Sequence, residues 1–138
     1  MGGASGAGMG GAGGRGGSGG GGAGGAAGGG GSDAATFANV YPLLMEICLG
    51  CHGDLADGGL NMITRDMAYM NLVGVNSRSC SGKKRVVAGD PSASVLFLAI
   101  DRTSADGCDP PDMPRGGSKW SQANIDKVKA WIEAGAPK

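Results

Sequence analysis

The stretch Cys48-Leu49-Gly50-Cys51-His52 is the most specific feature of this 138-residue sequence. Two thiols three positions apart lie on one turn of a helix, where both can add to the vinyl groups along one edge of a porphyrin. His52 follows directly, so its imidazole can take an axial position on the iron. The pentapeptide therefore predicts covalently bound haem c, with Cys48 and Cys51 as thioether attachments and His52 as the proximal iron ligand.

Two other uses of paired cysteines fit the sequence less well. A redox-active C-x-x-C motif does not need the histidine that follows here. A structural zinc site needs four clustered ligands, whereas the sequence has a single His and its other two cysteines, Cys80 and Cys108, are far apart. Haem attachment remains the preferred interpretation.

The composition changes sharply near residue 32. Residues 1–32 are almost all Gly, Ala and Ser, and Arg15 is the only charged side chain among them. Such a segment has little to bury and much backbone entropy to lose, so we expect a disordered, Gly-rich tether. Residues 33–138 are long enough for one small domain.

The overall charge excludes two classes of partner. The formal net charge is +0, so no global field favours nucleic acid or an anionic membrane. No apolar run approaches the length of a membrane span. We expect a monomeric domain that binds no nucleic acid and does not span a membrane.

Helical periodicity predicts an all-α fold of about four helices. The first covers 40–48, with Asn39 as N-cap and Pro42 in the first turn. The second covers 65–73, where Met67 and Met70 are expected to pack in the core. The third begins at Asp90 and runs to about 100, and the fourth covers 121–134.

A loop methionine is the best candidate for the second axial ligand. Met113 lies in Asp109-Pro110-Pro111-Asp112-Met113-Pro114, where the prolines fix the backbone and leave little entropy to lose on ligation. Met62 is the runner-up, although we expect it to line the haem pocket together with Leu60. The sequence thus predicts His52 and Met113 as the two iron ligands.

The part of the chain after the tether resembles class I cytochromes c, especially single-haem bacterial envelope cytochromes. The resemblance rests on the haem motif, the Met113-Pro114 pair and four further segments: Val40-Tyr41-Pro42-Leu43-Leu44, Gly58-Gly59-Leu60, Val86-Val87-Ala88-Gly89-Asp90-Pro91 and Ile125 through Ala136. It implies a cytochrome c-like fold around one covalent haem, with His52/Met113 ligation. It also implies one-electron transfer between a redox donor and a redox acceptor, without enzymatic turnover.

The resemblance further implies that haem is attached outside the cytoplasm. We therefore expect export to the periplasm or the outer face of the bacterial envelope, by a signal that this sequence does not contain. The tether is expected to link the domain to a lipid anchor or an envelope partner. Cys80 and Cys108 then form an even pair suited to a disulfide in an oxidising compartment, with two free thiols as the alternative.

Three other functions remain open for a haem domain. It can be the electron-input domain of a larger oxidoreductase, a haem peroxidase or a gas sensor. Peroxidase chemistry needs a polar acid–base group on an open distal side, and the sequence offers none. The basic run Lys83-Lys84-Arg85 can neutralise haem propionates or dock a partner, although such runs usually form a solvated face.

Overall fold

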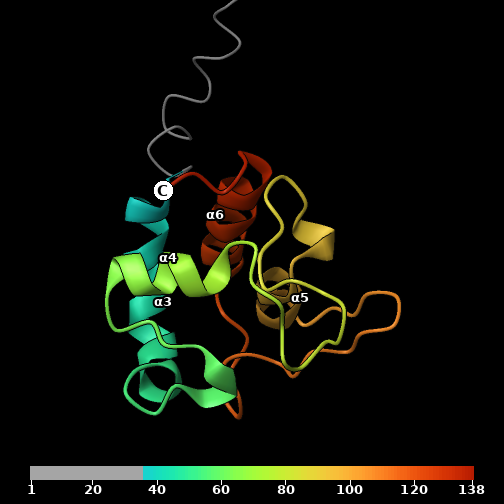
Figure 1. Cartoon of the computed structure of the whole chain (residues 1–138), viewed down its shortest axis with the longest axis horizontal. Helices are drawn as coiled ribbons and strands as arrows, with labels where there is room; N and C mark the ends of the chain where they lie inside the picture. Colours follow the sequence, from blue (N-terminus) through green and yellow to red (C-terminus); the bar gives the residue numbers. More distant parts are fainter. Residues whose placement is uncertain (1–35) are drawn as a thin grey trace, which may run out of the picture.

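The computed structural model describes residues 36–138, so the predicted tether 1–32 and the first residues of the predicted domain lie outside it. The described part is all-α, as predicted, and extended segments within it pair only through isolated bridges. Figure 1 shows the arrangement of four α-helices and two 3₁₀ turns: α3 (Phe37–His52), η2 (Asp57–Gly59), α4 (Arg65–Leu72), η3 (Pro91–Ala93), α5 (Val95–Asp101) and α6 (Gln122–Glu133).

Helix α3 is longer than predicted at both ends. It begins three residues earlier, with Thr36 instead of Asn39 at the N-cap position. The side-chain amide of Asn39 donates to Thr36 Oγ1 at 3.3 Å, and Phe37 is fully buried in the first turn. The prediction of the start was wrong because tertiary burial of Phe37 favours the added turn.

Pro42 consequently lies inside α3 and not in its first turn. A proline there removes the hydrogen bond to the carbonyl of Ala38, four residues earlier. Both Pro42 and Ala38 are exposed, so water can replace the lost partner. The helix therefore continues to His52.

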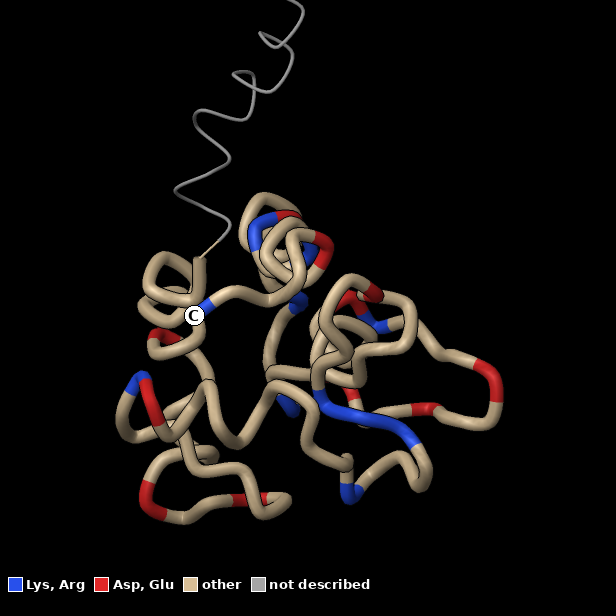
Figure 2. The backbone as a smooth tube through the Cα atoms, turned by 45° about the horizontal axis from the view of Figure 1, so that its top comes forward, with Lys and Arg blue, Asp and Glu red and all other residues tan. Residues whose placement is uncertain are grey.

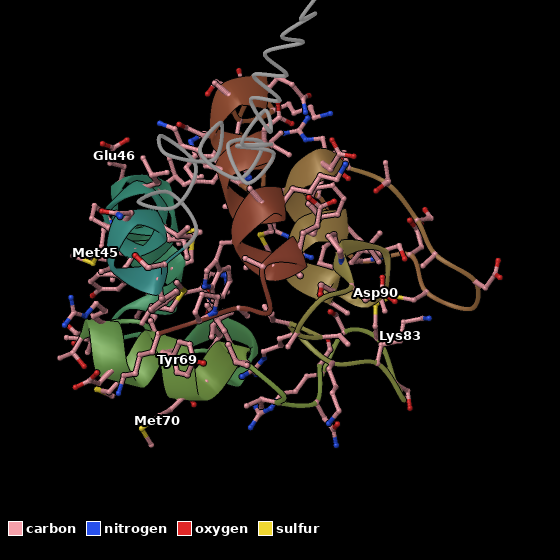
Figure 3. All side chains as sticks on the ribbon, turned by 90° about the horizontal axis from the view of Figure 1, so that it is seen from above. Met45, Glu46, Tyr69, Met70, Lys83 and Asp90 are labelled. Carbon is pink, nitrogen blue, oxygen red and sulfur yellow. A yellow bond between two sulfur atoms is a disulfide. The ribbon has the colours of Figure 1, made fainter. Side chains whose placement is uncertain are left out.

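Helix α4 ends within one residue of its predicted boundary, but its buried face differs from the prediction. Thr64 caps the helix, because its hydroxyl accepts from the N–H of Met67 at 3.2 Å. Ala68 and Leu72 are buried, whereas Met67 is 39% exposed and Met70 is 70% exposed. Figure 3 shows Met70 projecting away from the body of the molecule. The expected core packing of Met67 and Met70 was wrong.

The third predicted helix is divided in two. Asp90 caps a 3₁₀ turn, where its carboxylate accepts from the N–H of Ala93 at 3.1 Å. Ser94 then takes an extended conformation, and α5 starts at Val95. The last helix matches the prediction: Ser121 accepts from the N–H of Asn124 at 3.3 Å, and Gly135, past the C-terminus, has φ +96°.

Helix α6 forms the centre of the packing, with α3 and α5 against it, and α4 crosses α3 (Figure 1). Phe37 of α3 and Trp131 of α6 are completely buried, with ring centroids 5.1 Å apart. The other fully or almost fully buried members of this core are Val40, Leu44, Met62, Ala68, Leu72, Val86, Ile100, Ile125, Val128, Ile132 and Ala136. None of the helices within 36–138 is long and apolar enough to cross a membrane.

Candidate functional site

The C-terminal turn of α3 brings the three residues of the haem motif to one face. Cys48, Cys51 and His52 occupy positions i, i+3 and i+4 of a helix, which lie above one another on the same side. All three line a single cavity of ≈ 660 Å³. That volume is within the usual range of small-molecule and cofactor sites.

Residues distant in sequence complete the same cavity. Leu60 and Met62 line it from the segment after η2, and Met113 lines it from the loop between α5 and α6. Met62 is 2% exposed, and Leu60 and Met113 are partly buried against the core. The structure thus places all six residues that we expected to bind haem on the wall of one cavity.

The loop that carries Met113 is held at several points. The backbone N–H of Met113 donates to the carbonyl of Ala99 on α5 at 3.0 Å. Pro110 is buried, and Pro110, Pro111 and Pro114 all line the cavity. Because these prolines restrict the backbone on both sides, Met113 would lose little backbone entropy if its thioether bound a metal.

A backbone carbonyl fixes the tautomer of His52. The ring nitrogen Nδ1 lies 2.9 Å from the carbonyl oxygen of Asp57, in the turn that follows α3. A carbonyl oxygen can only accept, so Nδ1 carries the proton, and in the neutral imidazole the lone pair is then on Nε2. This arrangement is the one that metal-binding histidines usually have, in which the second ring N–H is held by a neighbouring acceptor.

Glycines allow the chain to make the turn after His52. A Cβ on Gly53 would lie 2.6 Å from the carbonyl oxygen of Leu49, which no ordinary side chain tolerates. Gly58 and Gly59 have φ values of +66° and +71°, in the left-handed region that favours glycine. These residues therefore bring the Asp57 carbonyl back to the imidazole.

The walls of the cavity are mainly apolar, but three arginines line them. Arg78 and Arg115 are exposed, whereas Arg85 is only 8% exposed. Within 36–138 no carboxylate lies within ion-pair distance of these three side chains. Burial, and secondly the charge of Arg78, lowers the pKa of Arg85.

Sequence reasoning missed the position of Arg85. It belongs to the basic run 83–85, the longest blue stretch of the tube in Figure 2, for which neutralisation of haem propionates or docking of a partner was left open beside the more usual solvated face. Lys84 is exposed, as expected, but Arg85 lies in the cavity wall. Nothing in the local pattern distinguishes the third residue of this run from the first two. The Asp57 carbonyl was missed too, because a backbone acceptor has no sequence signature.

The environment of Cys48 does not suit an attacking thiol in thiol–disulfide exchange. Both thiols are free, and Cys48 is partly buried while Cys51 is exposed. Burial, with a smaller contribution from Cys51, raises the pKa of Cys48 to about 11. Redox-active cysteine pairs instead need a lowered pKa, because the thiolate is the attacking species.

The other two cysteines form a disulfide beside the cavity. Cys80 and Cys108 are bonded, with 5.4 Å between their Cα atoms, and pack against Val95 at the start of α5. Residues immediately before Cys80 and shortly after Cys108 line the cavity, namely Arg78, Ser79, Pro110 and Pro111. The bond thus joins two segments of the cavity wall.

No group of three or more His, Cys, Asp or Glu side chains arranged to hold a metal ion occurs within residues 36–138. A haem iron with one His and one Met ligand would take a single ligand of these types, so the expected pair His52 and Met113 does not depend on such a group.

The chain was compared with known protein families, curated proteins and solved structures, and nothing matches it. The resemblance to class I cytochromes c therefore stays a prediction that rests on the residues quoted for it.

Proposed function

We propose that this domain is a single-haem c-type cytochrome that carries one electron at a time. The observation that carries the proposal is the convergence of Cys48, Cys51, His52 and Met113 on one cavity, although Met113 is more than sixty positions away in the chain. Two thiols, an imidazole and a thioether are the four protein groups that a covalently attached, six-coordinate haem takes.

The cavity fits such a group in two further respects. The Asp57 carbonyl holds the proton of His52 on Nδ1, so the neutral imidazole has its lone pair on Nε2, which is the form that binds a metal. The arginines that line the cavity have no carboxylate partner within 36–138, so they can neutralise the carboxylates of haem propionates. The cavity wall needs both apolar residues and arginines, because haem has an apolar body and an anionic edge.

When bound, haem supplies an iron that cycles between the ferric and ferrous states. In the proposed function, Cys48 and Cys51 keep it attached in both states. His52 and Met113 would be its two iron ligands and would thereby keep water and substrates off the iron. Leu60 and Met62 provide apolar wall, which favours the less charged, ferrous form.

The proposal includes the setting in which the domain acts. We place it in the periplasm or on the outer face of the bacterial envelope, where c-type haem is attached and where the Cys80–Cys108 disulfide persists. A redox protein donates the electron and another accepts it. The domain has no catalytic residues of its own in this proposal.

The test uses the chain exported from cells that have haem-attachment machinery. The ferric protein is expected to show the methionine-to-iron charge-transfer band in its visible spectrum. Met113→Ala should abolish this band, lower the reduction potential and admit cyanide, because the distal position is then open or binds water. Met70→Ala is the matched control, since Met70 is exposed on α4 and does not line the cavity. An unchanged band in Met113→Ala would reject Met113 as the ligand.

The same preparation separates the proposal from its alternatives. Rapid binding of cyanide or carbon monoxide by the resting wild-type protein would favour a peroxidase or a gas sensor over a carrier. Peroxide turnover would then distinguish the enzyme from the sensor. Co-purification of the domain with a larger oxidoreductase that it reduces would favour an electron-input domain.

A further inference from the structure

Arg85 is a buried arginine whose contacts are directed at the backbone. One guanidinium nitrogen, Nη1, donates to the carbonyl of Asn71 at 2.8 Å, and the other, Nη2, donates to the carbonyl of Gly58 at 3.0 Å. Burial of a charge without a carboxylate partner costs free energy, so the hydrogen bonds that hold Arg85 have to offset that cost. The two fixed N–H directions of a guanidinium can join two carbonyls, which an ammonium group cannot do in the same planar geometry.

The two carbonyls belong to different elements. Asn71 lies on α4, whereas Gly58 lies in η2, the turn that follows His52. The side chain of Asn71 also joins α4 to the segment after η2, because its amide donates to the carbonyl of Asn61 at 3.0 Å. Arg85 and Asn71 therefore fasten the segment after His52 to α4 at two points.

The Gly58 carbonyl is adjacent to the acceptor that holds His52. Asp57 precedes Gly58, and its carbonyl oxygen lies 2.9 Å from His52 Nδ1. Arg78 approaches the same turn, where a Cβ on Gly59 would lie 2.5 Å from its guanidinium carbon. Because the two carbonyls are in successive peptide units of one short turn, release of the Gly58 carbonyl would free the turn that carries the Asp57 carbonyl.

We propose that Arg85 is a positioning residue for His52: it clamps the turn Asp57–Gly59 to α4 and so maintains the hydrogen bond from His52 Nδ1 to the Asp57 carbonyl. This inference rests on the proposed function, in which His52 binds iron through Nε2. A firmly held Nδ1–H makes the imidazole a stronger donor and favours the ferric iron. Loosening the clamp should therefore raise the reduction potential.

Arg85→Lys is the variant that tests the clamp in the haem-loaded protein. The lysine keeps a positive charge in the cavity wall, so it can still neutralise carboxylates. It lacks the two guanidinium nitrogens that donate to the carbonyls of Asn71 and Gly58. We expect hydrogen exchange of the His52 Nδ1–H, measured by NMR in the ferrous protein, to accelerate about tenfold, the factor that corresponds to one net hydrogen bond. The reduction potential should rise while the methionine band persists.

Arg115→Lys is the matched control. Arg115 lines the same cavity, but no hydrogen bond in the described part of the chain joins it to the turn. It should leave the exchange of the His52 ring N–H unchanged. Equal effects of the two substitutions, or no effect of Arg85→Lys on that exchange, would overturn the inference and reduce Arg85 to a source of charge.

A second measurement needs no substitution and covers the case in which Arg85→Lys fails to fold. In the wild-type holoprotein the Arg85 guanidinium should rotate slowly, so that its Nη protons give separate, exchange-protected resonances. A freely rotating guanidinium would overturn the clamp. Wild-type protein that takes up no covalent haem would instead reject the proposed function, and the inference with it.

Discussion

Replacement of the Cys80–Cys108 disulfide by two alanines should strongly destabilise the domain. The two cysteines are 2% and 7% exposed, so alanine introduces no buried hydroxyl that would add a cost of its own. Substitution is preferable to chemical reduction, because dithiol reductants also reduce a ferric haem. The double variant therefore removes the bond without changing the oxidation state of the haem.

The expected magnitude follows from the length of chain that the bond closes. The cysteines are 28 positions apart, and loop-closure entropy for such a length corresponds to about 3.6 kcal/mol at room temperature. A domain of roughly 100 residues unfolds with a free energy of about 5–15 kcal/mol, so the loss removes a large fraction of it. The midpoint of thermal unfolding should fall by roughly 15–30 °C.

Urea unfolding of the holoprotein measures this change and tests its origin. The entropic account places the effect in the unfolded chain, which becomes more expanded once the link is absent. The dependence of the unfolding free energy on urea should therefore become steeper as the midpoint falls. A loss below about 1 kcal/mol with an unchanged slope would refute the reasoning.

Three further predictions concern the frame around the site. Ser94→Ala should lower the free energy of unfolding, measured with urea, by about 1–3 kcal/mol. The fully buried Ser94 hydroxyl accepts from the N–H of Val87 at 2.8 Å, and that donor would lose its partner. An unchanged free energy would mean that water replaces the hydroxyl. Gly53→Ala should lower the unfolding free energy by roughly 1–3 kcal/mol, since its Cβ would collide with a carbonyl oxygen of α3; an unchanged thermal midpoint would contradict the required close approach. Hydrogen bonds from the Ser92 hydroxyl and, secondly, from the N–H of Ala93 lower the pKa of Asp90. The contribution of Asp90 to stability is therefore fully present above about pH 4, and it is lost as the pH falls through the pKa of the folded state. The stability difference between wild type and Asp90→Asn should accordingly shrink on acidification, and a difference that stays constant to low pH would argue against this linkage.

Local signals predicted the helices well where the relevant information is local. The predicted helix 121–134 agrees with α6, whereas the Asp90-Pro91 pair marked a helical start correctly but not the break at Ser94 that separates the 3₁₀ turn from α5. The spacing of the haem motif placed Cys48 and His52 on the same wall because that spacing is the period of a helix.

The errors arise where tertiary contacts decide the outcome. Burial of Phe37 extends α3 past its expected start, and Met70 is exposed because α4 presents Ala68 and Leu72 to the core in its place. Arg85 follows two lysines in sequence, and only the approach of Asn71 and Gly58 from other elements draws it into the cavity. Contacts of this kind join segments that no local pattern relates.

The intact mass of the exported chain under denaturing conditions tests the central claim most directly. It should be measured beside Cys48→Ala/Cys51→Ala in the same cells, with a known c-type cytochrome as the control for the attachment machinery. The account predicts that the wild-type chain exceeds its polypeptide mass by one haem and that the double variant does not. A wild-type chain of polypeptide mass alone, in cells that load the control, would contradict the account.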